Sequence, residues 1–111
     1  MNNLQVFVNN KPIDKFYKGI FLQKKYIEIE VNEKINENRN IKINLFGYNY
    51  NESRVINWNS DGLSYYNNIL ENNRSMFINC DMYDEFLPWK ILIEKKNDDL
   101  YIKTVKHYLK K

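Results

Sequence analysis

Alternation of apolar and polar side chains is the feature of this sequence that most constrains its fold. Residues 27–31 read Ile-Glu-Ile-Glu-Val, and residues 41–45 read Ile-Lys-Ile-Asn-Leu. A period of two residues is that of a β-strand, because a strand directs successive side chains to opposite faces of a sheet. The pattern therefore predicts strands that have one face on a core and the other in water.

Further segments share this pattern or the β-branched and aromatic composition of strands. The predicted strands are residues 4–8, 16–22, 26–31, 41–48, 54–59, 76–80, 89–94 and 100–105. Most breaks between them contain asparagine, which tolerates the left-handed backbone conformation of tight turns. Asn9-Asn10 and residues 95–99 predict hairpin turns, residues 32–40 predict a long polar loop, and Gly19 predicts a bend or bulge.

One segment has a helical period instead. Leu63, Tyr66 and Leu70 follow the turn signal at residues 59–62, so we expect one short helix near residues 61–71, capped by Ser60 or Asp61. Residues 98–111 fit either a strand or a helix. The β-branched and aromatic residues in this tail favour the strand.

The length of 111 residues predicts a single domain that spans residues 1–111. Alanine is absent and asparagine occurs 19 times, a composition that disfavours long helices and is also typical of an AT-rich bacterial or phage genome. The predicted fold class is all-β or β-rich α+β. We expect a small antiparallel sandwich or half-open barrel of about seven or eight strands with one short helix.

Several classes of protein do not fit the composition. Cys80 is the only cysteine, so neither an intrachain disulfide nor a cysteine-based zinc site is expected. No leader and no apolar run of roughly 20 residues is visible, which predicts a cytoplasmic protein without a membrane partner. The net charge of +3 comes from 17 basic and 14 acidic residues that are mixed along the chain, which permits nucleic acid without favouring it.

Catalytic and cofactor motifs are not apparent. His107 is the only histidine and stands among lysines, which favours a solvated surface residue, whereas Cys80 resembles a small core residue. The carboxylates Asp81, Asp84 and Glu85 lack the spacing of a calcium loop, and the three glycines stand apart from any phosphate-binding motif. We therefore expect no enzyme, no catalytic residue, no metal and no cofactor.

The aromatic residues are the one unusual feature of the chain that could support binding. Tyrosine, tryptophan and arginine often anchor protein interfaces, although the same aromatics can stack on bases or simply fill the core. The predicted partner-binding residues are an aromatic group around one arginine and an acidic group, namely Tyr48, Tyr50, Arg54, Trp58, Tyr65, Tyr66, Asp81, Asp84 and Glu85.

Three functions remain open on these grounds. The first is a non-enzymatic module that binds one cognate protein, such as a toxin, and inhibits it by steric occlusion, as a bacterial immunity protein, antitoxin or phage defence blocker does. The second is a small nucleic-acid-binding barrel, which predicts that Lys24, Lys25, Lys42 and Arg54 share one face with exposed aromatics. The third is a half-barrel for a small apolar ligand, which predicts an interior that side chains do not fill.

Overall fold

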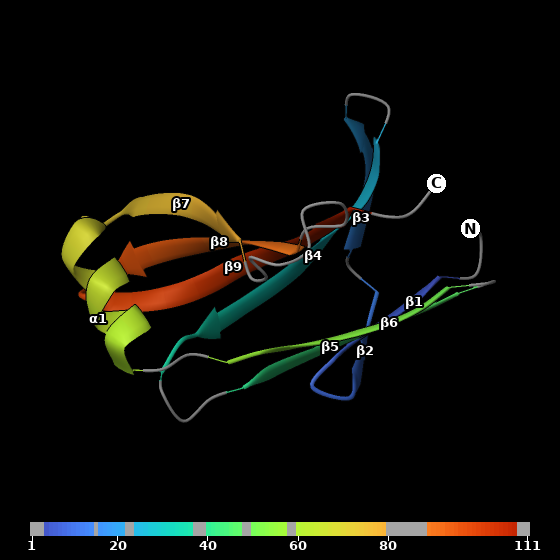
Figure 1. Ribbon diagram of the computed structural model, residues 1–111, viewed down its shortest axis with the longest axis horizontal. Coiled ribbons are helices and arrows are strands. Elements are labelled where there is room, and N and C mark those ends of the chain that lie inside the picture. The colour runs from blue at the N-terminus through green and yellow to red at the C-terminus, as the bar shows by residue number, and fades with distance from the viewer. Residues whose placement is uncertain are drawn as a thin grey trace.

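The computed structural model describes residues 4–14, 16–21, 24–36, 40–47, 50–57, 60–79 and 89–108, and for residues 20, 21, 24 and 50 it describes the backbone alone. These residues form antiparallel strands and one helix (Figure 1). The elements are β1 (Gln5–Val8), β2 (Lys11–Ile13), β3 (Phe16–Phe21), β4 (Lys24–Lys34), β5 (Ile41–Gly47), β6 (Tyr50–Ile56), α1 (Ser60–Ile69), β7 (Arg74–Asn79), β8 (Trp89–Lys96) and β9 (Asp99–Tyr108).

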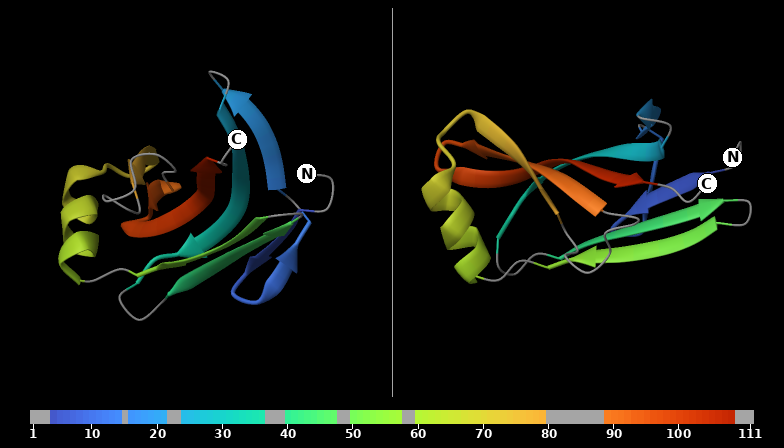
Figure 2. Two further views of the ribbon diagram at one scale, coloured as in Figure 1. Left: turned by 45° about the vertical axis from the view of Figure 1, so that its right-hand side comes forward. Right: turned by 45° about the horizontal axis from the view of Figure 1, so that its top comes forward.

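The strands form two separate antiparallel sheets, with the orders β2-β1-β5-β6 and β3-β4-β9-β8-β7. Figure 2 shows the four-stranded sheet lying across one face of the five-stranded sheet, while β3 and β4 curve away from it. The predicted β-rich fold class is confirmed, and its sandwich form is the one observed. One core cluster joins the sheets, with Val6, Ile43 and Leu45 from one sheet and Ile29 and Ile102 from the other.

Asparagine turns shape the hairpins as the sequence predicts. Asn9 and Asn10 have φ angles of 50° and 66° between β1 and β2, and Asn97 and Asp98 have 52° and 66° between β8 and β9. Two consecutive left-handed residues make the turn whose twist matches that of the flanking strands. Over its described residues the tail is the strand β9 (Asp99–Tyr108), which lies at the centre of the five-stranded sheet between β4 and β8.

The long loop predicted for residues 32–40 begins too early. β4 continues to Lys34 through Asn32, whose φ of 52° accommodates an extra residue in the pairing with β9 between Glu30 and Glu33. β9 in turn carries one extra residue, Lys103, in its pairing with β8. Bulges bend a strand without ending it. The sequence predicted a loop here because Asn32, Glu33 and Lys34 are all polar.

Other predicted boundaries also shift. Lys11–Ile13 forms the short strand β2, which the sequence suggests only as a turn, and β6 begins at Tyr50 instead of Arg54. Gly19 is not a bulge, since β3 pairs with β4 without a register shift. The glycine lies directly under the ring of its cross-strand partner Tyr26, and any Cβ there would overlap that ring.

The predicted helix is confirmed as α1, which covers one end of the sandwich (Figure 1). Leu63 and Tyr66 pack against the core, and Leu70 is buried just after the helix ends. The ammonium of Lys95 in β8 donates a hydrogen bond of 2.6 Å to the carbonyl oxygen of Asn67, which ties the helix to the five-stranded sheet.

Candidate functional site

Three tyrosines form a row on the outer face of the five-stranded sheet. Ile27 and Ile29 of β4 face the core, so the residues that alternate with them face outward. Tyr26 is therefore on the outer face, with Tyr108 beside it on β9 and Tyr17 beside it on β3. The ring centroids of Tyr17 and Tyr26 are 6.0 Å apart, and those of Tyr26 and Tyr108 are 5.8 Å apart.

Two lysines lie over this row. The ammonium of Lys106 is 4.0 Å from the ring centroid of Tyr26 and 5.5 Å from that of Tyr108. The ammonium of Lys90 is 6.0 Å from the same Tyr108 ring. Each contact of this kind contributes about 0.5–1 kcal/mol at an exposed site, so the rings and ammonium groups hold one another in place. We call Tyr17, Tyr26, Tyr108, Lys90 and Lys106 the tyrosine–lysine patch.

The Tyr26 hydroxyl remains protonated at higher pH than a free tyrosine. A side-chain hydrogen bond with Tyr17 is the main cause of the raised pKa of Tyr26, followed by partial burial and by the nearby Tyr17 and Glu28 side chains. Each of these disfavours the negative phenolate. Tyr26 thus presents a phenol group that donates and accepts hydrogen bonds, beside the lysine side chains of the patch.

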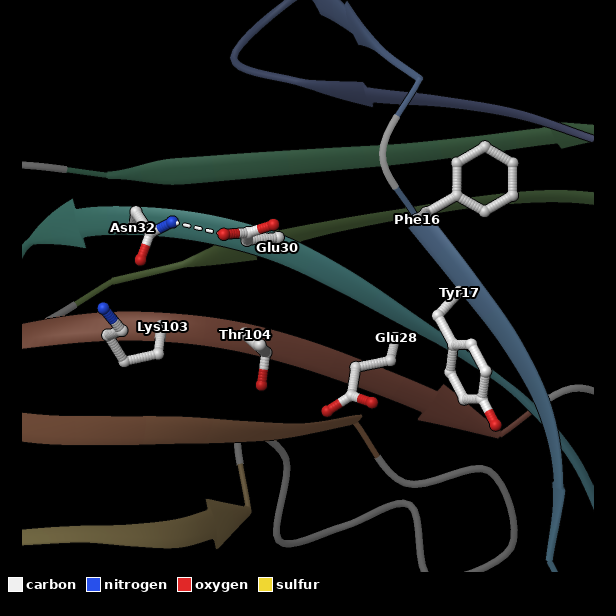
Figure 3. A pocket seen from close by; sticks show the side chains of 7 residues that line it. All are labelled: Phe16, Tyr17, Glu28, Glu30, Asn32, Lys103 and Thr104. Carbon is white, nitrogen blue, oxygen red and sulfur yellow. Dashed lines mark hydrogen bonds between the residues drawn. The ribbon is translucent and has the colours of Figure 1, made fainter.

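An open hollow of about 460 Å³ adjoins the patch (Figure 3). Its lining combines aromatic, acidic and amide side chains with one lysine and one threonine, namely Phe16, Tyr17, Glu28, Glu30, Asn32, Lys103 and Thr104. Figure 3 shows Phe16 and Tyr17 pointing to opposite sides of β3, with Tyr17 on the side of Glu28. The Asn32 side-chain amide donates a hydrogen bond of 2.8 Å to Glu30, which orients that carboxylate.

Residues at both bulges line this hollow. Asn32 and Lys103, the residues at the extra positions of β4 and β9, both line it. A second hollow of about 420 Å³ shares Glu30 and Asn32 with the first and continues along Pro12, Ile13 and Asp14. The outer face is thus not flat, and a protruding partner segment would find carboxylates and aromatic surface together.

The prediction that His107 is a solvated surface residue is wrong. Instead of lying in solvent, its side chain is 1% exposed and stacks on Trp89, with ring centroids 3.9 Å apart and an interplanar angle of 14°. The guanidinium of Arg54 lies 5.9 Å from the Trp89 ring. Because Arg54 is opposite the buried Ile43, it faces the space between the sheets. These three residues bridge the sheets from the inside.

The sequence-predicted contact residues are not gathered on one visible surface. Tyr65 is 58% exposed on α1, whereas Tyr66 packs against the core and Arg54 faces Trp89. The structure describes Tyr50 only as backbone at the start of β6. Outside the described residues lie Tyr48, Trp58, Cys80, Asp81, Asp84 and Glu85, so the contact they were predicted to make stays a prediction.

The basic residues that the nucleic-acid hypothesis places on one face do not all lie on the same face. Lys42 pairs with the exposed Val55 and projects from the outer face of the four-stranded sheet, whereas Arg54 projects from the opposite face. The side chain of Lys24 is outside the described residues. As for the apolar-ligand hypothesis, the two hollows above open on the outer surface and have carboxylates in their walls.

Sequence reasoning missed the tyrosine–lysine patch, although part of its signal was present. Tyr26 has the parity of Glu28 and Glu30, opposite to the core isoleucines, which marks it as outward-facing. What the sequence does not show is that β3 and β9 flank β4. Only that pairing brings residues 17, 26 and 108 together.

In comparisons with known proteins, no family model, no curated protein and no solved structure matches the chain. Within the described ranges, no three His, Cys, Asp or Glu side chains group in a way that could hold a metal ion. The described helix is too short and too polar to cross a lipid bilayer.

Proposed function

We propose that this protein is a non-enzymatic binding module that neutralises one partner protein by covering its working surface, with the tyrosine–lysine patch and the adjoining hollow as the contact surface. The observation that carries the proposal is the row of three ring-packed tyrosines under Lys106. Anchors that are already ordered lose little conformational entropy on binding, and aromatic anchors dominate the energy of protein interfaces.

The charges around the patch favour a protein over a nucleic acid as partner. Glu28 and Glu30 project from β4 beside the tyrosines, and Glu28 lies directly opposite Lys106. A phosphate backbone bound along this face would meet those carboxylates as closely as the lysines, whereas a protein can match both signs. The expected partner surface therefore offers an acidic group to Lys90 and Lys106 and a basic group to Glu28 and Glu30.

Inhibition by occlusion needs a rigid surface more than a reactive group. The patch rests on the four hydrogen-bonded strands β3, β4, β9 and β8, with the core side chains Ile27, Ile29 and Val105 directly behind it. This support suits the role of an immunity protein, an antitoxin or a phage protein that blocks a host defence. The cognate partner in each case is a single protein, for example a toxin.

The test is capture of the partner by the immobilised full chain from lysate of the source organism, followed by titration of the identified partner. Tyr17→Ala and Lys106→Glu variants should lose at least tenfold in affinity, because each removes or reverses an anchor at the centre of the surface. Val55→Ala serves as the matched control, since Val55 is exposed on the outer face of the other sheet.

Three outcomes would overturn the proposal. One is capture of nucleic acid in place of a protein. Another is a partner whose affinity is unchanged by Tyr17→Ala and Lys106→Glu. The third is a partner that is bound but retains its full activity in the complex, which would leave the binding intact and remove the inhibitory role.

A further inference from the structure

A small apolar pocket lies between the β1–β2 hairpin and the start of β3. Its volume is about 200 Å³, and Val6, Ile13 and Phe16 are among the side chains that line it, with Asp14 beside them. An apolar cavity of about 150 Å³ is large enough for a benzene molecule. The pocket can therefore hold one leucine or phenylalanine side chain of another molecule, and we call it the anchor pocket.

The anchor pocket adjoins the two hollows on the outer surface. It shares Ile13 and Asp14 with the second hollow, which in turn shares Glu30 and Asn32 with the first. Together the three spaces form a groove from β9 across β4 to the β1–β2 hairpin, which we call the β2–β4 groove. A partner side chain in the anchor pocket would therefore belong to a segment that also occupies the hollows.

Charge complementarity indicates the chemistry of that segment. The walls of the groove contain three carboxylates, Asp14, Glu28 and Glu30, and one ammonium, that of Lys103, although the whole chain has a net charge of +3. In the part of the chain that the structure describes, Asp14 and Glu28 form no ion pair or hydrogen bond, and Glu30 accepts its hydrogen bond from Asn32. A positively charged segment would supply the counter-ions.

The positions of the carboxylates favour several separate cations over one ion. Within the described ranges, no three acidic, histidine or cysteine side chains group in a way that could hold a metal ion. Glu28 and Glu30 alternate on β4 with Cα atoms about 6.5 Å apart, and Asp14 belongs to another segment. Lys106 is opposite Glu28, but its ammonium lies over the ring of Tyr26. A segment with two or more basic side chains matches this arrangement.

The walls of the first hollow favour arginine over lysine. Phe16 and Tyr17 bring aromatic surface to the same hollow as Glu28 and Glu30 (Figure 3). A guanidinium group is planar, so it can stack on an aromatic ring while it donates two parallel hydrogen bonds to a carboxylate. The hydrogen bond from Asn32 holds the Glu30 carboxylate in place for such a contact.

We propose that the partner inserts a basic segment into the β2–β4 groove. This segment places an arginine against Glu28 and Glu30, a second basic side chain against Asp14, and an apolar side chain in the anchor pocket. The inference rests on the proposed function, because it specifies which part of the partner the contact surface takes up. Among the described residues, Tyr17 alone belongs to both the groove and the tyrosine–lysine patch. Substitutions elsewhere in the groove therefore leave the patch intact.

Titration of the full chain with a short peptide tests the groove in the absence of the partner. The probe is acetyl-Gly-Arg-Gly-Arg-Leu-amide, and the amide NMR signals of the ¹⁵N-labelled chain report its binding. We expect saturable shifts, and about tenfold weaker binding by Glu30→Lys and by Asp14→Lys, because each turns an attraction into a repulsion. Both side chains are exposed, so these variants should fold. Glu94→Lys, on the outer face of β8 outside the groove, should bind the peptide as the wild type does.

Two further probes separate the parts of the segment. A peptide with glycine in place of the leucine should bind about tenfold more weakly, because it leaves the anchor pocket empty. Spermidine has separated cations but neither a guanidinium group nor an apolar side chain. It should therefore also bind about tenfold more weakly than the leucine peptide.

Four results would overturn the inference. They are the absence of a saturable shift with the leucine peptide, an affinity that Glu30→Lys and Asp14→Lys leave unchanged, a glycine peptide bound as tightly as the leucine peptide, and spermidine bound as tightly as either. None of them alters the effect of Lys106→Glu on the partner, which tests the proposed function. Conversely, peptide binding by a chain that captures no protein would retain the specificity of the groove and remove the inhibitory role.

Discussion

The ammonium of Lys106 lies 4.0 Å from the ring centroid of Tyr26, on the outer face of the five-stranded sheet. The two residues are 80 positions apart in the sequence, and neighbouring strands bring them together. This contact lies at the centre of the surface that we assign to partner binding, and the first prediction concerns it.

Replacing Lys106 with Met should lower the stability of the protein slightly and its partner affinity by a larger factor. The methionine keeps the apolar stem but removes the cation over Tyr26 and Tyr108, so we expect a loss of about 0.5–1 kcal/mol in the free energy of unfolding. Urea titration measures this loss. Partner affinity should fall by a larger factor, whereas Lys42→Met, on the outer face of the four-stranded sheet, should change neither quantity appreciably.

Replacing Tyr17 with Phe should lower the pKa of Tyr26 toward the ordinary tyrosine value of 10.0, because the variant removes the hydrogen bond that is the main cause of the raised pKa. In the wild type, the pKa of Tyr26 is higher in the folded protein than in the unfolded chain. Stability should therefore fall as the pH rises above 10.0 and through the pKa of folded Tyr26. The variant should lose less stability over that window. NMR titration of ring-labelled tyrosine measures the pKa, and an unchanged value in Tyr17→Phe would contradict the assignment. Tyr65→Phe on α1 is the control.

Replacing Gly19 with Ala should destabilise the protein by about 1–3 kcal/mol, because the added methyl group overlaps the Tyr26 ring. The effect should shrink when Tyr26 is also replaced by Ala, since the obstructing ring is then absent. A double-mutant cycle in denaturant measures this coupling. Additive effects of the two substitutions would show that the ring does not impose the glycine.

Replacing Trp89 with Ala should cost about 3–5 kcal/mol, the range for a large buried aromatic side chain. The indole is fully buried, stacks on His107 and lies near Arg54, so its loss leaves a cavity between the two sheets. Phe77→Ala is the comparison, because Phe77 is 50% exposed on β7 and should cost much less. Equal losses in thermal or denaturant unfolding would contradict the burial of Trp89.

The sequence predicts strands well where alternation is strict and turns well where two asparagine or aspartate residues follow each other. It fails at residues 32–34, because three consecutive polar residues end the apolar alternation although β4 continues to Lys34. It fails at His107 for a related reason. Flanking lysines suggest solvent, yet His107 has the parity of the buried Val105, while Lys106 points to the other face.

The candidate site was less accessible to sequence reasoning than the fold. Aromatic density drew attention to residues 48–66, but density does not distinguish Tyr66, which packs against the core, from the exposed Tyr65. The outward direction of Tyr26 follows from its own strand. Its neighbours Tyr17 and Tyr108 follow only from the order of strands in the sheet, which local patterns do not specify.

The central place of β9 has a consequence for biosynthesis. During translation β4 leaves the ribosome about 60 residues or more before β9, yet the two must pair, and β8 reaches β4 only through β9. Until then β4 offers an unsatisfied edge and an uncovered isoleucine face to other nascent chains. Slow synthesis or ribosome stalling within residues 89–108 should therefore favour aggregation, and a chaperone that shields β4 should raise the yield of folded protein.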